Sequence, residues 1–232
     1  MTNTQLAVRL VTSPRRFFEN LADSPRFALP MWIVVLCTAA LVFWFYSIVD
    51  LQWIVDLQLQ SNPNSARMTE EQRQAAARFM TRGLLTWSAA IATVFFLFAI
   101  RLLEALYYRI AGSTTGLVRS YRQWFAFAWW TSLPGLLAVI PSAITLAFSR
   151  NGQVDPAALQ PLSLNALFFH LAPAERGYQV LSNVSVLMVV TLALAVFGVH
   201  VWSRRSWLYS AVFALLPVAL IALVTVALVV RR

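Results

Sequence analysis

Residues 28–49 read ALPMWIVVLCTAALVFWFYSIV, an apolar stretch without a charged side chain. A helix needs about 20 consecutive, mostly apolar residues to cross a bilayer, so this stretch predicts a membrane-spanning helix. Only helices and closed barrels satisfy their backbone polar groups in lipid, and this continuous pattern does not alternate as barrel strands do. Four further stretches of this kind follow at residues 83–100, 124–148, 180–202 and 207–230.

The five stretches predict an all-α, polytopic integral membrane protein whose five transmembrane helices form one domain at residues 28–230. The composition agrees, because 59% of the residues are hydrophobic and only 12% are charged, about half the charged share of a soluble domain. The net charge is +9 without any lysine, which we interpret as a sign of a GC-rich bacterial genome. The arginines lie at span ends rather than in a basic stripe, so we expect them at lipid headgroups and not on nucleic acid.

Residues 1–27 precede the first span and predict a cytoplasmic, interfacial amphipathic helix. Ser13 is a favourable N-cap and Pro14 suits the first helical position. The apolar side chains Phe17, Phe18 and Leu21 share one face, which we expect to lie in the headgroup layer. The alternative is a flexible, solvated arm.

The distribution of arginine predicts the orientation. If the N-terminus is cytoplasmic, the inner segments carry ten of the 18 arginines, including Arg204 and Arg205 in a four-residue link. By the positive-inside rule we predict a cytoplasmic N-terminus and a periplasmic C-terminus. Outside, Thr69 and Gln72 predict a capping box that opens a helix continuous with the second span. Residues 162–171 predict a short interfacial helix that Ser163 could cap.

The spans lack the groups that membrane chemistry needs. No acidic residue lies in the middle of a span, so a proton relay is difficult to build. The chain has no catalytic or nucleotide-binding motif, and its single cysteine, Cys37, excludes an intramolecular disulfide. His170 lies on the apolar patch at residues 162–171 and His200 near the inner end of the fourth span. An interfacial role is the simplest interpretation of both, and a ligand or pH-sensor role is the alternative for His170. We therefore expect no enzymatic activity, no cofactor and no metal.

Polar residues and prolines within the spans are the remaining candidates. Arg101 and Glu104 are three residues apart at the inner end of the second span and can pair on one helix face. Such a pair either anchors the helix or contacts a partner. Pro134 and Pro141 in the third span and Pro217 in the fifth predict helix kinks, which either adjust packing or shape a cavity.

The connection between the second and third spans carries a family resemblance. Residues 107–112 read YYRIAG, Gly116 follows, residues 120–128 read SYRQWFAFA and residues 132–134 read SLP. With the opening SPRRFF at residues 13–18, this pattern resembles the bacterial branch of the Yip family of Rab-interacting-type membrane proteins. The resemblance implies five spans, a cytosolic N-terminus and a short outer C-terminus.

The resemblance also implies a role without catalysis. Eukaryotic members bind prenylated Rab GTPases, whereas some bacterial relatives accompany macrolide-type ABC exporters with their periplasmic adaptors. We predict a scaffold or accessory subunit of the bacterial inner membrane that contacts membrane lipids and a membrane-protein partner. The candidate partners are an ABC permease, an ATPase or a periplasmic adaptor. A homo-oligomer is the other candidate assembly. The alternative is an autonomous permease, channel or lipid-handling protein with a cavity beside the Pro134 and Pro141 kinks. The predicted contact surface comprises Arg101, Glu104, Arg109, Gly112, Gly116, Arg119, Tyr121 and Arg122.

Overall fold

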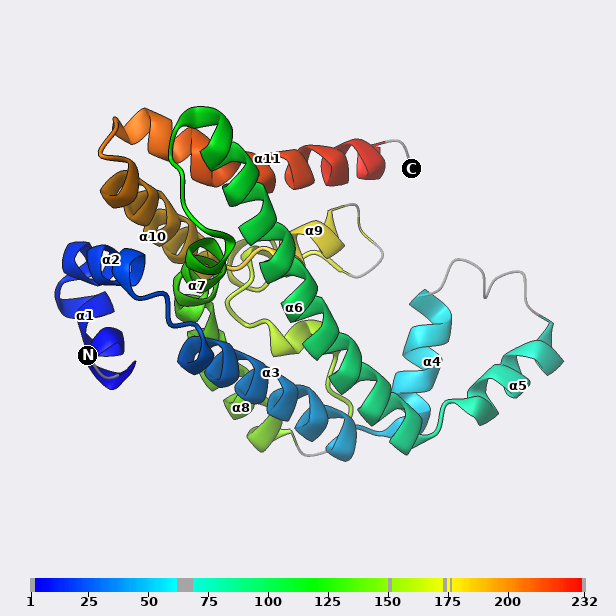
Figure 1. Ribbon diagram of the computed structural model, residues 1–232. Coiled ribbons are helices and arrows are strands. Elements are labelled where there is room, and N and C mark those ends of the chain that lie inside the picture. The colour runs from blue at the N-terminus through cyan, green and yellow to red at the C-terminus, as the bar shows by residue number, and fades with distance from the viewer. Residues whose placement is uncertain (1–2, 62–68, 150–151, 173–174, 176, 231–232) are drawn as a thin grey trace.

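The computed structural model describes residues 3–61, 69–149, 152–172, 175 and 177–230. Helices joined by short connections dominate this part of the chain (Figure 1). In chain order they are α1 Asn3–Thr12, α2 Pro14–Asp23, α3 Ala28–Ile48, α4 Leu51–Ser61, α5 Glu70–Phe79, α6 Arg82–Thr115, α7 Tyr121–Thr131, the 3-10 helix η2 Leu133–Ala138, α8 Val139–Phe148, the 3-10 helix η3 Pro156–Leu159, the π-helix η4 Asn165–Phe169, α9 Tyr178–Asn183, α10 Val186–Ser203 and α11 Trp207–Val230.

The all-α, multi-pass membrane architecture is confirmed. Four helical segments are long and apolar enough to cross a bilayer: Ala28–Ile48, Arg82–Thr115, Tyr121–Phe148 and Val186–Ser203. The fifth predicted span corresponds to α11, whose apolar part with described side chains, Trp207–Leu220, is shorter. Large apolar side chains such as Phe95 (74% exposed) and Val189 (67% exposed) point out of the bundle, as side chains that face lipid do.

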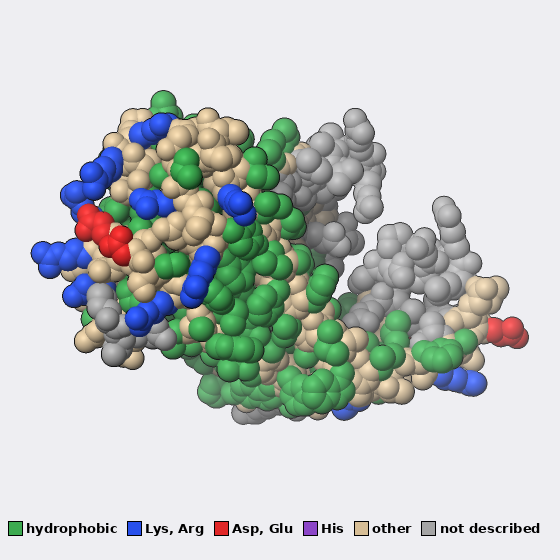
Figure 2. Space-filling view, viewed as in Figure 1, with side chains coloured by type: hydrophobic (Ala, Val, Ile, Leu, Met, Phe, Trp, Pro, Cys, Tyr) green, Lys and Arg blue, Asp and Glu red, His purple; other side chains and the backbone are tan. Residues whose placement is uncertain are grey.

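The bundle has two distinct ends (Figure 1). We call one the α2 end; it comprises α1, α2, the α6–α7 connection and the α10–α11 turn. The other, the α4 end, comprises the last turn of α3, α4 and the first turn of α6. The long helix α6 packs against α3, α7 and α11, and α10 packs against α11 and α2. Basic side chains gather over the α2 end, and hydrophobic ones cover the middle of the molecule (Figure 2).

Helix α7 forms the centre of the core. All side chains from Trp124 to Trp130 are buried, and Trp124, Trp129 and Trp130 are completely inaccessible. A helix that is apolar all round is stable only when other elements surround it. The Trp124 ring accordingly packs against Trp202 of α10 and Tyr108 of α6, with ring centroids 4.9 and 5.1 Å apart.

The N-terminal segment differs from the prediction. It forms two helices, and the apolar face of α2 lies in the protein core instead of the headgroup layer: Phe17, Phe18 and Leu21 are fully buried. The Phe18 ring lies 5.5 Å from Phe127, and the Trp202 indole N–H donates to the Phe18 carbonyl at 2.7 Å. A bundle surface that offers both apolar contacts and an indole donor holds this helix better than the headgroup layer can. Pro14 opens α2 as predicted, but the Ser13 side chain makes no capping bond.

Two predicted spans begin differently. The capping box of Thr69 and Gln72 is confirmed, with bonds of 3.0 and 3.3 Å. However, α5 ends at Phe79, and Thr81 caps a separate helix, α6, by accepting from the Leu84 N–H at 3.3 Å. The fourth predicted span likewise starts later than predicted, at Val186 instead of residue 180. The Ser185 side chain caps α10 there, after α9 has ended. Hydroxyl side chains favour N-caps over helix interiors, and the apolar periodicity did not reveal these breaks.

The prolines and the short outer helix lie as follows. Pro134 is the second residue of η2, where the third span changes from α-helix to 3-10 helix. Pro141 is the third residue of α8, and Pro217 lies inside α11. The predicted helix at residues 162–171 is a π-helical turn, Asn165–Phe169, and the Ser163 hydroxyl accepts from the Ala166 N–H at 3.2 Å.

Candidate functional site

The α6–α7 connection is a short loop held firmly at both ends. Gly116 ends α6 with φ 79°, a left-handed conformation that favours glycine. At Gly112 a Cβ atom would lie 2.5 Å from the Leu117 carbonyl oxygen, so only glycine permits this close return of the chain. Ser120 and Gln123 then form a capping box at the start of α7, with bonds of 3.3 and 2.7 Å. Residues 117–120 are thereby held in a defined position.

The Arg101–Glu104 pair connects α6 to α7. The two side chains form the predicted salt bridge and are only 18% and 20% exposed. The Arg101 guanidinium also donates to the Ala128 carbonyl of α7 at 3.3 Å. A charge pair with its donors used in this way stabilises helix packing and leaves little for a ligand.

The eight predicted contact residues therefore fall into two groups. Five have a role in the fold: the Arg101–Glu104 pair, the turn glycines Gly112 and Gly116, and Tyr121, whose hydroxyl donates to the Leu102 carbonyl at 3.1 Å. Arg109 and Arg122 are exposed, and Arg119 is half-buried. Within the described chain, no ion pair joins any of these three arginines to a carboxylate.

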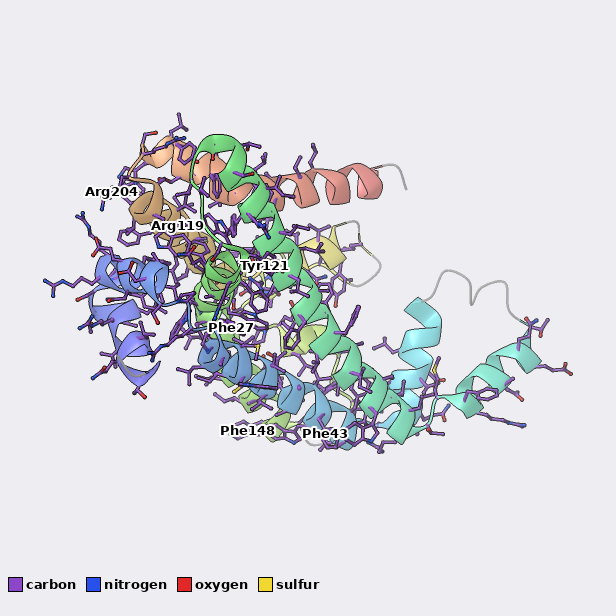
Figure 3. All side chains as sticks on the ribbon, viewed as in Figure 1. Phe27, Phe43, Arg119, Tyr121, Phe148 and Arg204 are labelled. Carbon is purple, nitrogen blue, oxygen red and sulfur yellow. The ribbon has the colours of Figure 1, made fainter. Side chains whose placement is uncertain are left out.

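Three of the predicted residues, Arg109, Arg119 and Tyr121, line a concave surface to which the structure adds Val118. Val118 at the tip of the loop is 76% exposed. It lines a hollow of about 680 Å³ together with Arg109, Tyr121 and Gln123. We call Arg109, Val118 and Arg122 the hairpin patch. Tyr121 lies near Arg119 and Arg204 at the same end of the molecule, far from Phe43 and Phe148 (Figure 3).

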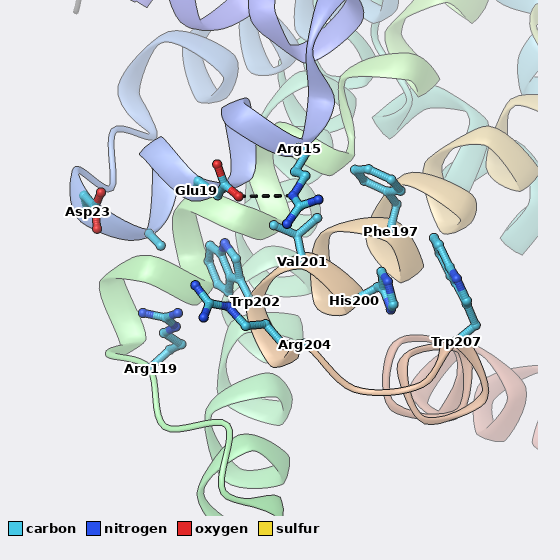
Figure 4. A pocket seen from close by; sticks show the side chains of 11 residues that line it. Arg15, Glu19, Asp23, Arg119, Phe197, His200, Val201, Trp202, Arg204 and Trp207 are labelled. Carbon is cyan, nitrogen blue, oxygen red and sulfur yellow. Dashed lines mark hydrogen bonds and ion pairs between the residues drawn. The ribbon is translucent and has the colours of Figure 1, made fainter.

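A second hollow of about 730 Å³ lies between α2, the α6–α7 connection and α10, and we call it the arginine hollow (Figure 4). Arg15, Arg119, His200 and Arg204 all line it. Sequence reasoning did not predict this site, because its residues come from three segments that lie far apart in the chain. A weak local signal was the adjacent pair Arg204 and Arg205.

Aromatic rings position the polar groups of the arginine hollow. The Arg119 guanidinium carbon lies 5.4 Å from the centroid of the Trp202 ring, which is a cation–π contact. The His200 ring stacks on Trp207 at 3.9 Å with an interplanar angle of 11°. Within the described residues, no group of three or more His, Cys, Asp or Glu side chains could hold a metal ion.

An apolar groove of about 700 Å³ runs between α3 and α6. Leu36, Phe43, Trp87, Ile91 and Phe95 line it. It faces outward from the bundle, where lipid chains or another transmembrane helix would cover it.

Comparison with known families is consistent with this architecture. The sequence profile of the Yip1 domain matches residues 8–228. The chain belongs to the Yip1 domain family. The match extends from α1 to α11, so the Yip1 domain includes the N-terminal helices that pack into the core. The predicted Yip-family resemblance is confirmed at this level. No curated protein and no solved structure gives a significant match.

Proposed function

We propose that this Yip1-domain protein is a non-enzymatic scaffold or accessory subunit that binds another membrane protein through the hairpin patch. The observation that carries the proposal is Val118, an apolar side chain 76% exposed on a loop held at both ends, with the exposed Arg109 and Arg122 on the flanking helices. Arginine is enriched at protein interfaces. A loop that is already ordered loses little conformational entropy when it binds.

The chemistry of the hairpin patch indicates the partner. Two arginines without carboxylate partners favour an acidic surface, and an exposed valine favours an apolar pocket. With the bundle oriented so that its basic α2 end is cytoplasmic, the partner binds at the cytoplasmic face of a bacterial inner membrane. An ABC permease or ATPase fits this description, and a periplasmic adaptor would instead contact the α4 end. Five spans with a periplasmic C-terminus are part of the same proposal.

Tagged purification from native membranes tests the hairpin patch. The structure refines the choice of variants, because Arg119 lies against Trp202 whereas Arg109 and Arg122 are exposed. Arg109→Glu with Arg122→Glu should reduce recovery of the partner by tenfold or more, about 1.4 kcal/mol. Val118→Asp should act in the same direction.

Matched controls come from exposed residues elsewhere. Val11 is 83% exposed, so Val11→Asp is the control for Val118→Asp. Arg16→Glu with Arg78→Glu is the control for the double charge reversal, because both arginines are exposed. Equal partner recovery from the hairpin-patch variants and from the wild type would refute this placement of the interface.

The alternative function, an autonomous permease or lipid-handling protein, is favoured by the apolar groove between α3 and α6. A groove of this size could hold an acyl chain. Liposomes that contain only this chain should then show substrate flux or lipid transfer. The variant Ala90→Trp, which fills the groove, should abolish that activity, whereas Val118→Asp should not affect it.

A further inference from the structure

Two cationic side chains of the arginine hollow, the half-buried Arg119 and the exposed Arg204, form no ion pair with any described residue. In Figure 4 the guanidinium groups of Arg119 and Arg204 point toward one another beside Trp202. Like charges that converge repel one another unless an anion lies between them. Arg15 is the exception in this hollow, since it pairs with Glu19 at 3.2 Å.

The carboxylates at the hollow do not neutralise Arg119 and Arg204. Glu19 is used by Arg15, and no ion pair joins Asp23 to an arginine in the described chain. In addition, Arg119 Nε and His200 Nδ1 are both buried and without a hydrogen-bond partner. A guanidinium nitrogen can only donate, so Arg119 Nε lacks an acceptor. Buried donors of this kind are uncommon in folded proteins and call for an explanation.

The backbone at Arg204 gives an independent observation. Its φ of 52° and ψ of 27° lie in the left-handed region that favours glycine. This residue ends α10, and its N–H donates to the His200 carbonyl at 2.9 Å. Glycine would satisfy the turn at lower conformational cost, yet the chain has an arginine whose side chain lines the hollow. Unfavourable conformations of this kind concentrate at binding sites, where the side chain has a use.

We infer that the arginine hollow binds a phosphate group. The planar forks of Arg119 and Arg204 match the oxygens of a phosphate in a bidentate manner. A shift of the Arg119 side chain toward the bound phosphate would give its enclosed Nε the acceptor that it lacks. The rings of Trp202 and Trp207 and the Phe197 side chain form an apolar wall for the rest of the ligand. This chemistry suits the headgroup of an anionic phospholipid or a soluble phosphate ester. Arg119 also lines the hollow beside the hairpin patch, but Arg204, Trp202 and Trp207 line the arginine hollow alone. Phosphate binding there does not depend on the proposed partner.

The thermal unfolding midpoint of the purified full-length chain in neutral detergent tests this site. One arm titrates inorganic phosphate at constant ionic strength against chloride. The other arm titrates short-chain phosphatidic acid in mixed micelles against phosphatidylcholine of the same chain length. A ligand that binds the folded state raises the midpoint saturably. A response to phosphatidic acid alone identifies a lipid headgroup, and a response to inorganic phosphate identifies a soluble phosphate compound.

Two variants distinguish binding from folding. Arg119→Gln with Arg204→Gln should weaken the response by tenfold or more in ligand concentration. Arg204→Gly removes the guanidinium but suits the left-handed backbone, so it should be at least as stable as the wild type without ligand and still lose affinity. Arg16→Gln with Arg78→Gln is the charge-matched control and should respond as the wild type does. A wild type that responds in neither arm, or an Arg204→Gly variant with unchanged affinity, would overturn the inference.

Discussion

Arg82 at the α4 end and three arginines at the α2 end differ in how they are partnered. At the α4 end, the Arg82 guanidinium donates to the Tyr46 and Ser47 carbonyls at 2.9 and 2.8 Å and so caps the C-terminus of α3. At the α2 end, Arg109, Arg119 and Arg122 make no ion pair within the described chain. Carbonyls at a helix C-terminus attract cations because they lack partners within the helix. The role of an arginine in this molecule thus depends on whether such acceptors lie within reach.

The hydrophobic support also differs between the ends. The α4 end has a small core formed by Phe45, Ile54 and Leu146. The α2 end rests on the large aromatic core around Trp124, with α2 packed against it. The α2 end therefore has the larger hydrophobic core, and its exposed cations, such as Arg109 and Arg122, are accessible to water and need no acceptor from the protein.

The largest expected effect would come from detaching α2 from the core. Phe18→Ala should lower the free energy of unfolding by about 3–5 kcal/mol, because it leaves a cavity among completely buried rings. Denaturant titration in detergent measures this change, and faster proteolysis within residues 1–27 should accompany it. Phe95→Ala, at a 74% exposed position, is the control. If Phe18→Ala and Phe95→Ala lowered the free energy of unfolding equally, α2 would not be packed in the core as described.

Removal of the arginine that caps α3 tests the contrast directly. Arg82→Ala should lower the free energy of unfolding by about 2 kcal/mol, because two helix-end carbonyls lose a charged donor. Arg204→Ala should change it by less than about 0.5 kcal/mol, because that side chain has no acceptor in the described chain. The same denaturant titration compares the two. A larger loss of stability in Arg204→Ala than in Arg82→Ala would contradict the conclusion that Arg82 stabilises the fold and Arg204 does not.

A somewhat smaller effect is expected at the start of α7. Gln123 closes the capping box with Ser120, and its side-chain amide donates to the Ala22 carbonyl at 2.6 Å. Gln123→Ala should therefore cost about 1–2 kcal/mol. Amide hydrogen exchange should increase in both α2 and the first turn of α7. The control is Gln52→Ala, which removes only an exposed hydrogen bond to Asp56. If amide exchange increased in α7 alone, the hydrogen bond between Gln123 and α2 would be absent in solution.

The smallest effect is expected where α6 meets α11. The Tyr107 hydroxyl donates to the Phe213 carbonyl at 2.8 Å. Tyr107→Phe keeps the ring and removes this one bond, so the free energy of unfolding should fall by about 1 kcal/mol. Thermal unfolding in detergent measures the shift. A midpoint identical to that of the wild type would show that water or detergent replaces the bond without cost.

The sequence predicted local features well and the candidate site only in part. The capping box at Thr69 and Gln72 and the Arg101–Glu104 pair involve residues three apart, so helical periodicity is sufficient to predict them. The breaks before Arg82 and Val186 were missed, because apolar runs do not show where a hydroxyl side chain caps a helix. The contact surface was predicted as one group of eight residues, whereas five of them have a role in the fold.

What the sequence alone determined is the membrane environment. A bilayer requires long apolar helices whatever their neighbours are, so length and composition suffice to predict an all-α, multi-pass architecture. Only the tertiary structure decided that α2 packs into the core and that Arg119 and Arg204 meet at one hollow. These features depend on which helices are neighbours, and in a bilayer steric fit and hydrogen bonding between helices decide that, because hydrophobicity is similar on every side.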